Sequence, residues 1–301
     1  TIFLMSDGSV FAAGRNEHGQ LGDGTTTGHA TPVQVPSMSG IYNVVAGDHH
    51  SLLLHNNWTL YAMGSNDFGQ LGDRTTQTPR SPIAVREWVR DLATGSCHTF
   101  FLDQEASNSL WVVGCNRYGH LGVGADPGPI INPLWLFTGV SSVRAGHFHN
   151  YYFKDGALYA MGRNDYGQLG DGTTVERHDP VQVLAGVQSV AIGFFHTIFL
   201  KNDGTLYAAG RNAEGQLGDG TETTRHSPVR VLEGTLASLL PTTTGTSTDV
   251  TTTETESTTL TATTAPKRAA IARSGSSFWP VGGTLLLGNS MLITWSMLSI
   301  S

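Results

Sequence analysis

The chain has 301 residues, with 17 Lys and Arg against 24 Asp and Glu, and only 14% of its residues are charged, where about 25% is usual. The net charge of −7 and the pI near 5.9 argue against a protein held on nucleic acid by a clustered basic face, so no nucleic-acid partner is expected. Cys97 and Cys115 are too few for a disulfide framework and lack the pairing of a zinc site, so we expect the core to hold the fold.

A phrase of nine residues recurs five times in the first 240 residues. It reads Gly-Arg-Asn-Glu-His-Gly-Gln-Leu-Gly at its first occurrence, and its copies begin at Gly14, Gly64, Gly114, Gly162 and Gly210. A second phrase, Gly-x-x-His, leads into an apolar run and ends at His50, His98, His149 and His196. A proline follows each nine-residue phrase, at Pro32, Pro82, Pro133, Pro180 and Pro228. Three marks in a fixed order indicate one structural unit repeated five times.

Within one repeat the pattern predicts short strands. The apolar runs 197–200 and 205–209 flank an Asn-Asp-Gly turn, which is typical of a β-hairpin. The stretches 180–183 and 187–192 supply two further strands, so each repeat is predicted to form an antiparallel sheet of about four strands. A sheet of this size cannot bury both faces alone, so the copies must stack. No sustained helical periodicity occurs in residues 1–236, and the fold class is therefore all-β and propeller-like.

The two phrases and the step of about 50 residues between copies resemble the repeat of the regulator of chromosome condensation family, the RCC1-type β-propeller, over residues 1–236. The resemblance implies an RCC1-like propeller with five detectable blades. Because family members typically have seven blades, often closed by strands from both termini, we expect an incomplete or truncated ring. The repeats are placed at approximately 1–46, 47–94, 95–145, 146–192 and 193–240.

The recurrent residues are predicted to be structural. The repeated glycines suit positive φ or close backbone approach where blades meet, and the four histidines form a ring that favours hydrogen bonding. A metal needs three or four converging ligands, whereas equivalent positions on successive blades are spread around a propeller, so no metal and no cofactor are expected. Nucleophile-elbow, phosphate-loop and zinc-protease motifs are missing from the sequence, and we expect no enzymatic activity.

Two departures from the repeat suggest further sites. The third repeat continues through the bulky apolar stretch 133–137, in which Trp135 and Phe137 are candidate partner contacts; the alternative is a variant strand that packs its own tryptophan. In the second repeat, Asn57-Trp-Thr59 fits the acceptor pattern for N-glycosylation.

The C-terminal region differs in composition. Residues 241–277 include 14 threonines between positions 242 and 264, which predicts a disordered stalk or linker. Residues 278–301 are uncharged and apolar, so they are predicted to be either a glycosylphosphatidylinositol (GPI) anchor signal or a transmembrane helix. Under the first alternative the attachment site is expected at Ser274, Gly275 or Ser276.

Two functions follow as hypotheses. The first is a non-enzymatic protein-binding or scaffold propeller, displayed at the cell surface or on a secretory-pathway membrane through the C-terminal segment. The alternative is an intracellular regulator in the cytoplasm or nucleus, such as a guanine-nucleotide exchange factor for a small GTPase, as the resemblance implies, or a ubiquitin-ligase-associated propeller. The regular spacing of the repeats leaves little room for a GTPase-facing insertion, and fold resemblance alone does not carry function.

Overall fold

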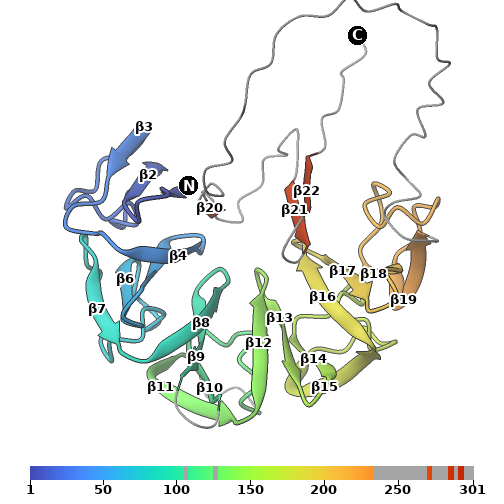
Figure 1. Cartoon of the computed structure of the whole chain (residues 1–301). Helices are drawn as coiled ribbons and strands as arrows, with labels where there is room; N and C mark the ends of the chain where they lie inside the picture. Colours follow the sequence, from blue (N-terminus) through green and yellow to red (C-terminus); the bar gives the residue numbers. More distant parts are fainter. Residues whose placement is uncertain (105–107, 125–127, 233–269, 273–283, 288–290, 295–301) are drawn as a thin grey trace, which may run out of the picture.

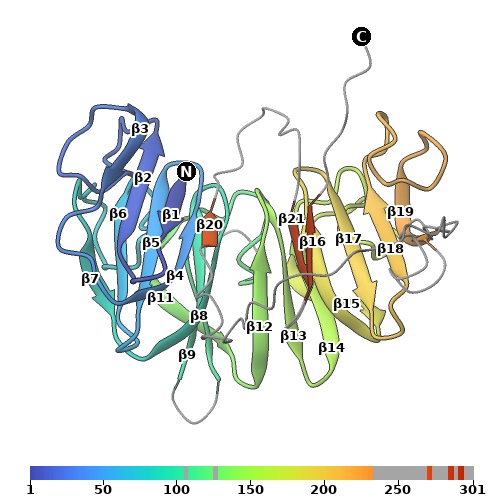
Figure 2. The same ribbon diagram turned by 45° about the horizontal axis from the view of Figure 1, so that its top comes forward.

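The computed structural model describes residues 1–104, 108–124 and 128–232, together with three short strand segments at 270–272, 284–287 and 291–294. These described residues form strands and no helix. Five four-stranded antiparallel sheets follow one another along an arc (Figure 1). Figure 2 shows them standing side by side, with the first and fifth sheets at the two ends of the arc. The all-β architecture of five repeated blades, expected from the sequence, is confirmed.

The sheets use consecutive strands except in one place. The first sheet has the order β20 (Ala270–Ala272), β1 (Ile2–Leu4), β2 (Val10–Gly14) and β3 (His29–Gln34). The second and third contain β4 (Ile41–Ala46), β5 (His50–His55), β6 (Leu60–Gly64) and β7 (Ile83–Arg86), then β8 (Val89–Thr94), β9 (His98–Asp103), β10 (Leu110–Gly114) and β11 (Ile130–Phe137). The fourth and fifth contain β12 (Val140–Ala145), β13 (His149–Lys154), β14 (Ala157–Gly162) and β15 (Arg177–Ala185), then β16 (Val187–Ile192), β17 (His196–Lys201), β18 (Leu206–Gly210) and β19 (Arg225–Leu232). A separate hairpin joins β21 (Thr284–Leu287) to β22 (Met291–Thr294).

The sheets are out of phase with the sequence repeats. The last strand of the repeat at 47–94 is β8, yet β8 is the first strand of the third sheet. Each sequence repeat therefore connects two neighbouring sheets. In the first sheet, the position of that first strand is taken by β20, which pairs antiparallel with β1. β20 lies in the range 241–277, whereas the threonine-rich residues 242–264 lie outside the described residues.

The hydrophobic core consists of separate layers, each between two adjacent sheets. Leu52 and Leu54 pack with Phe101 and Val113 of the third sheet, whereas Leu53 points to the other face, towards the first sheet. Side chains alternate between faces along a strand, so a run of three buried leucines fills two cores at once. Full burial of one such side chain stabilises the fold by about 1.5–3 kcal/mol. This explains why an apolar run, rather than an alternating pattern, follows each Gly-x-x-His phrase.

Hydrogen bonds from the repeated histidines tie neighbouring sheets together. Each Nε2 contacts the residue that follows the histidine of the next repeat: His50 contacts Thr99 Oγ1 at 3.2 Å, His98 contacts Asn150 Oδ1 at 3.0 Å, and His149 contacts Thr197 Oγ1 at 3.1 Å. Two of the contacted residues then donate to a loop of the preceding sheet, Thr99 Oγ1 to the Gln70 carbonyl at 2.7 Å and Asn150 Nδ2 to the His120 carbonyl at 2.6 Å. The two repeated phrases are thus parts of one hydrogen-bond network.

The asparagine of the nine-residue phrase organises the loop in which it lies. Asn164 is fully buried; its Oδ1 accepts from the backbone N of Leu169 at 3.0 Å, and its Nδ2 donates to Asp171 Oδ1 and to the carbonyls of Thr173 and Val175 at 3.0–3.1 Å. The Asp-Gly pairs after this phrase thereby serve to close the loop.

The first glycine of each phrase sits where the loop meets the hairpin below it. All five have φ between 99° and 117°, a region that L side chains rarely adopt. A Cβ at Gly162 would lie 2.4 Å from the carbonyl oxygen of Phe148. Only glycine allows this approach of two backbones.

The buried histidines predict a pH-dependent stability. Burial lowers the pKa of His50 and of His149 to about 3, whereas an unfolded chain titrates histidine near about 6.5. Between these values the unfolded state binds more protons, so the free energy of unfolding should fall as the pH drops from about 6.5 and level off near about 3. Each residue contributes at most about 1.4 kcal/mol per pH unit. Urea denaturation across this range measures the slope.

We expect His149→Gln to flatten that slope, and the exposed-site control His226→Gln to leave it unchanged. A stability independent of pH between about 6.5 and 4 would contradict the neutral, buried state of these rings.

The asparagine network predicts a second effect on stability. Asn164→Ala leaves the buried Leu169 amide without its acceptor, so we expect the free energy of unfolding to fall by about 2–4 kcal/mol. The control Asn202→Ala changes an exposed asparagine at a hairpin tip, and should alter stability by less than about 0.5 kcal/mol. Thermal and urea unfolding of the three proteins give the comparison, and equal stabilities would show that the network is dispensable.

Candidate functional site

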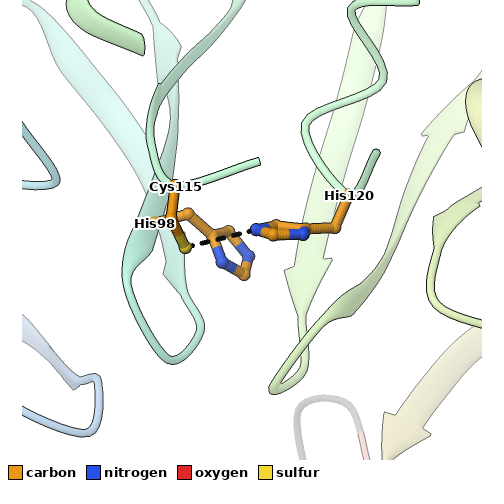
Figure 3. A group of neighbouring side chains, drawn as sticks. All are labelled: His98, Cys115 and His120. Atoms are coloured by element: carbon orange, nitrogen blue, oxygen red, sulfur yellow. Dashed lines mark hydrogen bonds between the residues drawn. The ribbon is translucent and has the colours of Figure 1, made fainter. Parts of the chain in front are cut away.

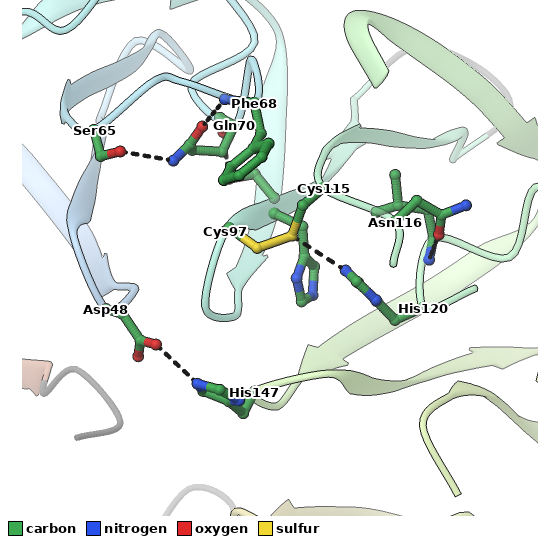
Figure 4. The surroundings of a disulfide bond; sticks show 12 residues. Asp48, Ser65, Phe68, Gln70, Cys97, Cys115, Asn116, His120 and His147 are labelled. Carbon is green, nitrogen blue, oxygen red and sulfur yellow. Dashed lines mark hydrogen bonds and ion pairs between the residues drawn. A yellow bond between two sulfur atoms is a disulfide. The ribbon is translucent and has the colours of Figure 1, made fainter. Parts of the chain in front are cut away.

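The second residues of the Gly-x-x-His loops bring different sheets together. Asp48 and His147 lie 99 positions apart, yet Asp48 Oδ2 is 2.9 Å from His147 Nε2 (Figure 4). The backbone N of Ser96 donates to the His147 carbonyl at 3.3 Å. The His147 ring stacks on Phe194 with centroids 4.1 Å apart. Loops of the second to fifth sheets therefore meet at this point of the molecule.

Asp48 is held in its ionised form at this junction. Burial opposes the charge, but hydrogen bonds from His147 and Ser96 outweigh that effect, and the pKa of Asp48 lies below its ordinary value. The carboxylate fixes the orientation of the His147 ring, and with it the surface against which Phe194 stacks.

From this junction an aromatic cluster extends over the loops of the third to fifth sheets. Its rings are those of Tyr118, His147, Phe148, Tyr166, Phe194 and Phe195, with neighbouring centroids 4.1–5.1 Å apart. The guanidinium carbon of Arg163 lies 5.0 Å from the ring centroids of both Tyr118 and Phe195. Phe194 is 42% exposed. Aromatic and arginine side chains dominate the energetics of protein interfaces, which makes this cluster the strongest candidate for partner contact.

Over the first two sheets the same loop face carries more polar and charged side chains, although Phe68, at the position of Tyr118 and Tyr166, is 43% exposed. Arg15 pairs with Glu17, and both side chains are more than 60% exposed. The positions equivalent to Phe148 and Arg163 hold His49 and Ser65 in the second sheet. The repeated scaffold thus presents a charged region and an aromatic region along one face.

Cys97 and Cys115 form a disulfide in the third sheet (Figure 4). The expectation that the core alone holds the fold is therefore corrected. The cause lies in the hairpin: His98 and Gly114 are register partners in β9 and β10, so the residues just outside that pair are brought together. The same neighbours are joined in the fourth repeat, where the Arg163 amide donates to the Phe148 carbonyl at 2.8 Å. Aligning the repeats against this hairpin register would have paired the two cysteines.

The two candidate contacts of the third repeat separate in the structure. Trp135 is 50% exposed, whereas Phe137 stacks on Tyr152 with centroids 5.5 Å apart. Leu110 pairs with Phe137 and Trp111 with Trp135, and a register shift between them adds a residue to β11. This irregularity sends the two side chains to opposite faces, because paired residues share a face. Of the two, Trp135 alone presents a large exposed surface.

A pocket of about 470 Å³ lies at the other end of the second and third sheets, lined by Thr59, residues 84–88 and Asp103. At its edge, Trp88 is 56% exposed. The guanidinium carbon of Arg86 lies 4.2 Å from the Trp111 ring centroid, and Trp111 Nε1 donates to Asp103 Oδ2 at 3.0 Å. This end carries an aromatic site smaller than the aromatic cluster.

The predicted glycosylation site lies beside this pocket, because Thr59 lines it. Asn57 is exposed at the turn between β5 and β6, where its Oδ1 accepts from the Thr59 amide at 3.0 Å. Ser274, Gly275 and Ser276 lie outside the described residues. Among the residues that the structure describes, no helix has the length and apolar character needed to cross a membrane.

Known proteins share this repeat. A family model of the RCC1-like domain matches residues 1–256. The human E3 ubiquitin-protein ligase HERC2 is 34% identical over 216 residues, which are 67% of this chain and 4% of the ligase. The ultraviolet-B receptor UVR8 of Arabidopsis thaliana is 30% identical over 211 residues, 65% of this chain and 48% of the receptor. The chain therefore spans a small part of HERC2 and about half of UVR8.

Solved structures share the fold. Human WBSCR16 has a TM-score of 0.65 at 24% identity, covering 75% of this chain and 63% of its own. Prp20p from Saccharomyces cerevisiae, described with its binding to Gsp1p and histones, has a TM-score of 0.64 at 24% identity, covering 76% and 60%. The repeated phrases, the four-stranded sheets and the family match agree, and this chain belongs to the RCC1-like domain family of β-propellers.

Proposed function

We propose that the chain is a non-enzymatic propeller that binds a protein partner through the aromatic cluster. The observation that carries the proposal is the run of stacked rings with Arg163 lying over two of them. The rings are held from below by the sheet-to-sheet network and from the side by the Asp48–His147 bridge. Binding to such a preorganised surface orders few additional side chains, which favours affinity.

The polar groups of the repeats support binding rather than catalysis. The buried His149 and Asn164 have hydrogen-bond partners within the scaffold, and Asp171 accepts from Asn164 and pairs with Arg177. Groups with such structural duties are poor acids, bases or nucleophiles, because catalysis needs a group that can reach a substrate.

The charge of the chain supports a protein as the partner. Phosphate contacts require clustered Lys and Arg, whereas this chain has a net charge of −7. Several of its arginines also pair with neighbouring carboxylates, as Arg15 does with Glu17 and Arg211 with Glu214. A partner with apolar side chains fits the aromatic rings.

We further propose display at the cell surface or on a secretory-pathway membrane through residues 278–301, by a GPI anchor or a spanning segment. The Cys97–Cys115 disulfide supports this, because disulfides persist in oxidising compartments. The exposed acceptor Asn57 fits the same compartment.

Intact source cells test the display proposal. Antibody against residues 1–232 should stain them without permeabilisation, and a phosphatidylinositol-specific phospholipase should release the protein if the anchor is GPI; staining without release assigns a spanning segment. A signal found only after permeabilisation would overturn display. In that case a small GTPase becomes the partner to assay for nucleotide exchange, since Prp20p is described with its binding to Gsp1p.

The aromatic cluster predicts which surface binds. Phe194→Ser places at this position the residue that Ser96 provides in the third repeat, so the fold should be retained. We expect partner affinity to fall by more than about tenfold, because truncating an exposed hot-spot aromatic removes about 2 kcal/mol or more of binding free energy. Cross-linking in source cells first identifies the partner. Titration of the purified variant against that purified partner then gives the affinity.

Trp88→Ser is the control at the other end of the sheets, where a larger and more exposed aromatic is removed. It should bind as the unchanged protein does. Loss of binding in this variant, with Phe194→Ser unaffected, would move the interface to the opposite end.

A further inference from the structure

The third repeat departs from the others at three positions that meet in space. At the position of Cys97 the neighbouring repeats have His49, Phe148 and Phe195; at that of Cys115 they have Arg15, Ser65, Arg163 and Arg211; and at that of His120 they have Gln20, Gln70, Gln168 and Gln216. The other repeats therefore serve as internal references. Unrelated changes would not be expected to fall in one repeat and converge on one place.

These residues surround the repeated histidine His98. One ring nitrogen of His98, one ring nitrogen of His120 and the Cys115 sulfur all lie within 4.8 Å of one another, and Figure 3 shows the three side chains turned towards each other. His120 Nε2 is 3.5 Å from Cys115 Sγ. The Cys97 sulfur is bonded to that of Cys115 and supplies a fourth donor at the same point. His98, Cys115 and His120 are all buried.

Asn150 sets the orientation and the tautomer of His98. His50 and His149 contact threonine hydroxyls, which can donate or accept, whereas His98 Nε2 contacts Asn150 Oδ1 at 3.0 Å. The amide is oriented by its 2.6 Å bond from Nδ2 to the His120 carbonyl. Its oxygen can only accept, so Nε2 carries the proton and Nδ1 keeps a lone pair. That Nδ1 is buried with no hydrogen-bond partner among the described residues.

His120 contacts the Cys115 sulfur, whereas the glutamines at this position in the other repeats bond to their own loop. In the other four repeats, Oε1 of the glutamine at this position accepts a hydrogen bond from the backbone amide two residues before it, as Gln70 does from Phe68 at 2.9 Å. His120 instead directs Nε2 at Cys115, and its Nδ1 is buried without a hydrogen-bond partner in the described part of the chain.

We infer that Cys97, His98, Cys115 and His120 bind one Zn²⁺ ion when the disulfide is reduced. Two thiolates and two imidazoles form a Cys₂His₂ set, which zinc binds tetrahedrally with bonds of about 2.0–2.3 Å. The separations of up to 4.8 Å between donors must shrink to about 3.5 Å in such a site, a change within reach of side-chain rotation. The complex is neutral overall, which suits a buried position. The Asn150 contact supplies the second-shell partner that ligating histidines use.

The conversion of the disulfide form to the zinc-bound form balances in electrons and protons. A dithiol reductant supplies two electrons and two protons, is itself oxidised to a disulfide, and converts the Cys97–Cys115 bond to two thiols. Cys97 is partly exposed, whereas Cys115 is buried, so the reductant approaches from the Cys97 side. Zn²⁺ then displaces both thiol protons to solvent as two Zn–S bonds form, while each imidazole binds through a neutral ring nitrogen.

This site differs from the histidine ring that the sequence suggested and set aside. His50 and His149 contact threonines of neighbouring sheets. His98 alone of the ring has two cysteines and a second histidine beside it.

Cobalt provides the direct test on the full chain. The protein is reduced with a phosphine under anaerobic conditions, and Co²⁺ is titrated in while the absorption spectrum is recorded. We expect one equivalent of Co²⁺ to give thiolate-to-metal charge transfer and tetrahedral ligand-field bands, which Zn²⁺ then displaces. The oxidised protein should give neither, and Zn²⁺ should raise the Tm of the reduced protein alone. Absence of the thiolate band at stoichiometric metal, with no rise in Tm, would overturn the inference.

Two variants assign the ligands. His120→Gln restores the residue of the other four repeats, so it should fold and form the disulfide, but its reduced form should bind Co²⁺ at least about tenfold more weakly. The control Gln168→His introduces the same side chain in a repeat without cysteines and should bind as the unchanged chain does. Retained affinity in His120→Gln would overturn the site.

Discussion

The three inner sheets of this propeller, the second to the fourth, bury both of their faces against neighbouring sheets. The consecutive residues Leu52, Leu53 and Leu54 contribute to two different cores, and Tyr151 and Tyr152 divide between two others in the same way. A single four-stranded sheet would leave one of these cores exposed to water, so stability is shared between neighbours as in other repeat proteins. The hydrogen bonds from the ring histidines then select one relative placement of the sheets, because they are satisfied only when each imidazole reaches the next repeat.

The network leaves other loop positions free to vary. It uses the histidine, the residue after it, the glycine and the asparagine, together with backbone groups, and does not use the two residues inside Gly-x-x-His. Those two positions hold Asp48 and His49 in one loop and Phe194 and Phe195 in another. The same backbone can therefore carry a charged region, a disulfide or an aromatic cluster without a change of fold.

The fold could be predicted from the sequence because the repeated phrases recur at a regular spacing. The sites depend on contacts between different repeats, which that spacing does not reveal. Five sheets follow from five copies of the phrase, while the phase between repeats and sheets, and the pairing of β20 with β1, depend on tertiary packing. The Asp48–His147 bridge joins residues 99 positions apart, and the sequence around either residue does not indicate that the two meet. The separation of Trp135 from Phe137 depends on a register shift, which alternation along a strand does not reveal.

The aromatic cluster and the cysteine–histidine site are physically adjacent. The Phe148 ring centroid lies 4.1 Å from that of His147, a member of the cluster, and 5.5 Å from that of His120. The proposed partner on the cluster and the proposed metal at His120 would therefore act on the same phenyl ring. Coupling between two binding sites is reciprocal, so a shift of this ring by either ligand changes the affinity for the other by the same factor. In this arrangement the redox state of one disulfide is linked to the proposed protein-binding surface through a single side chain.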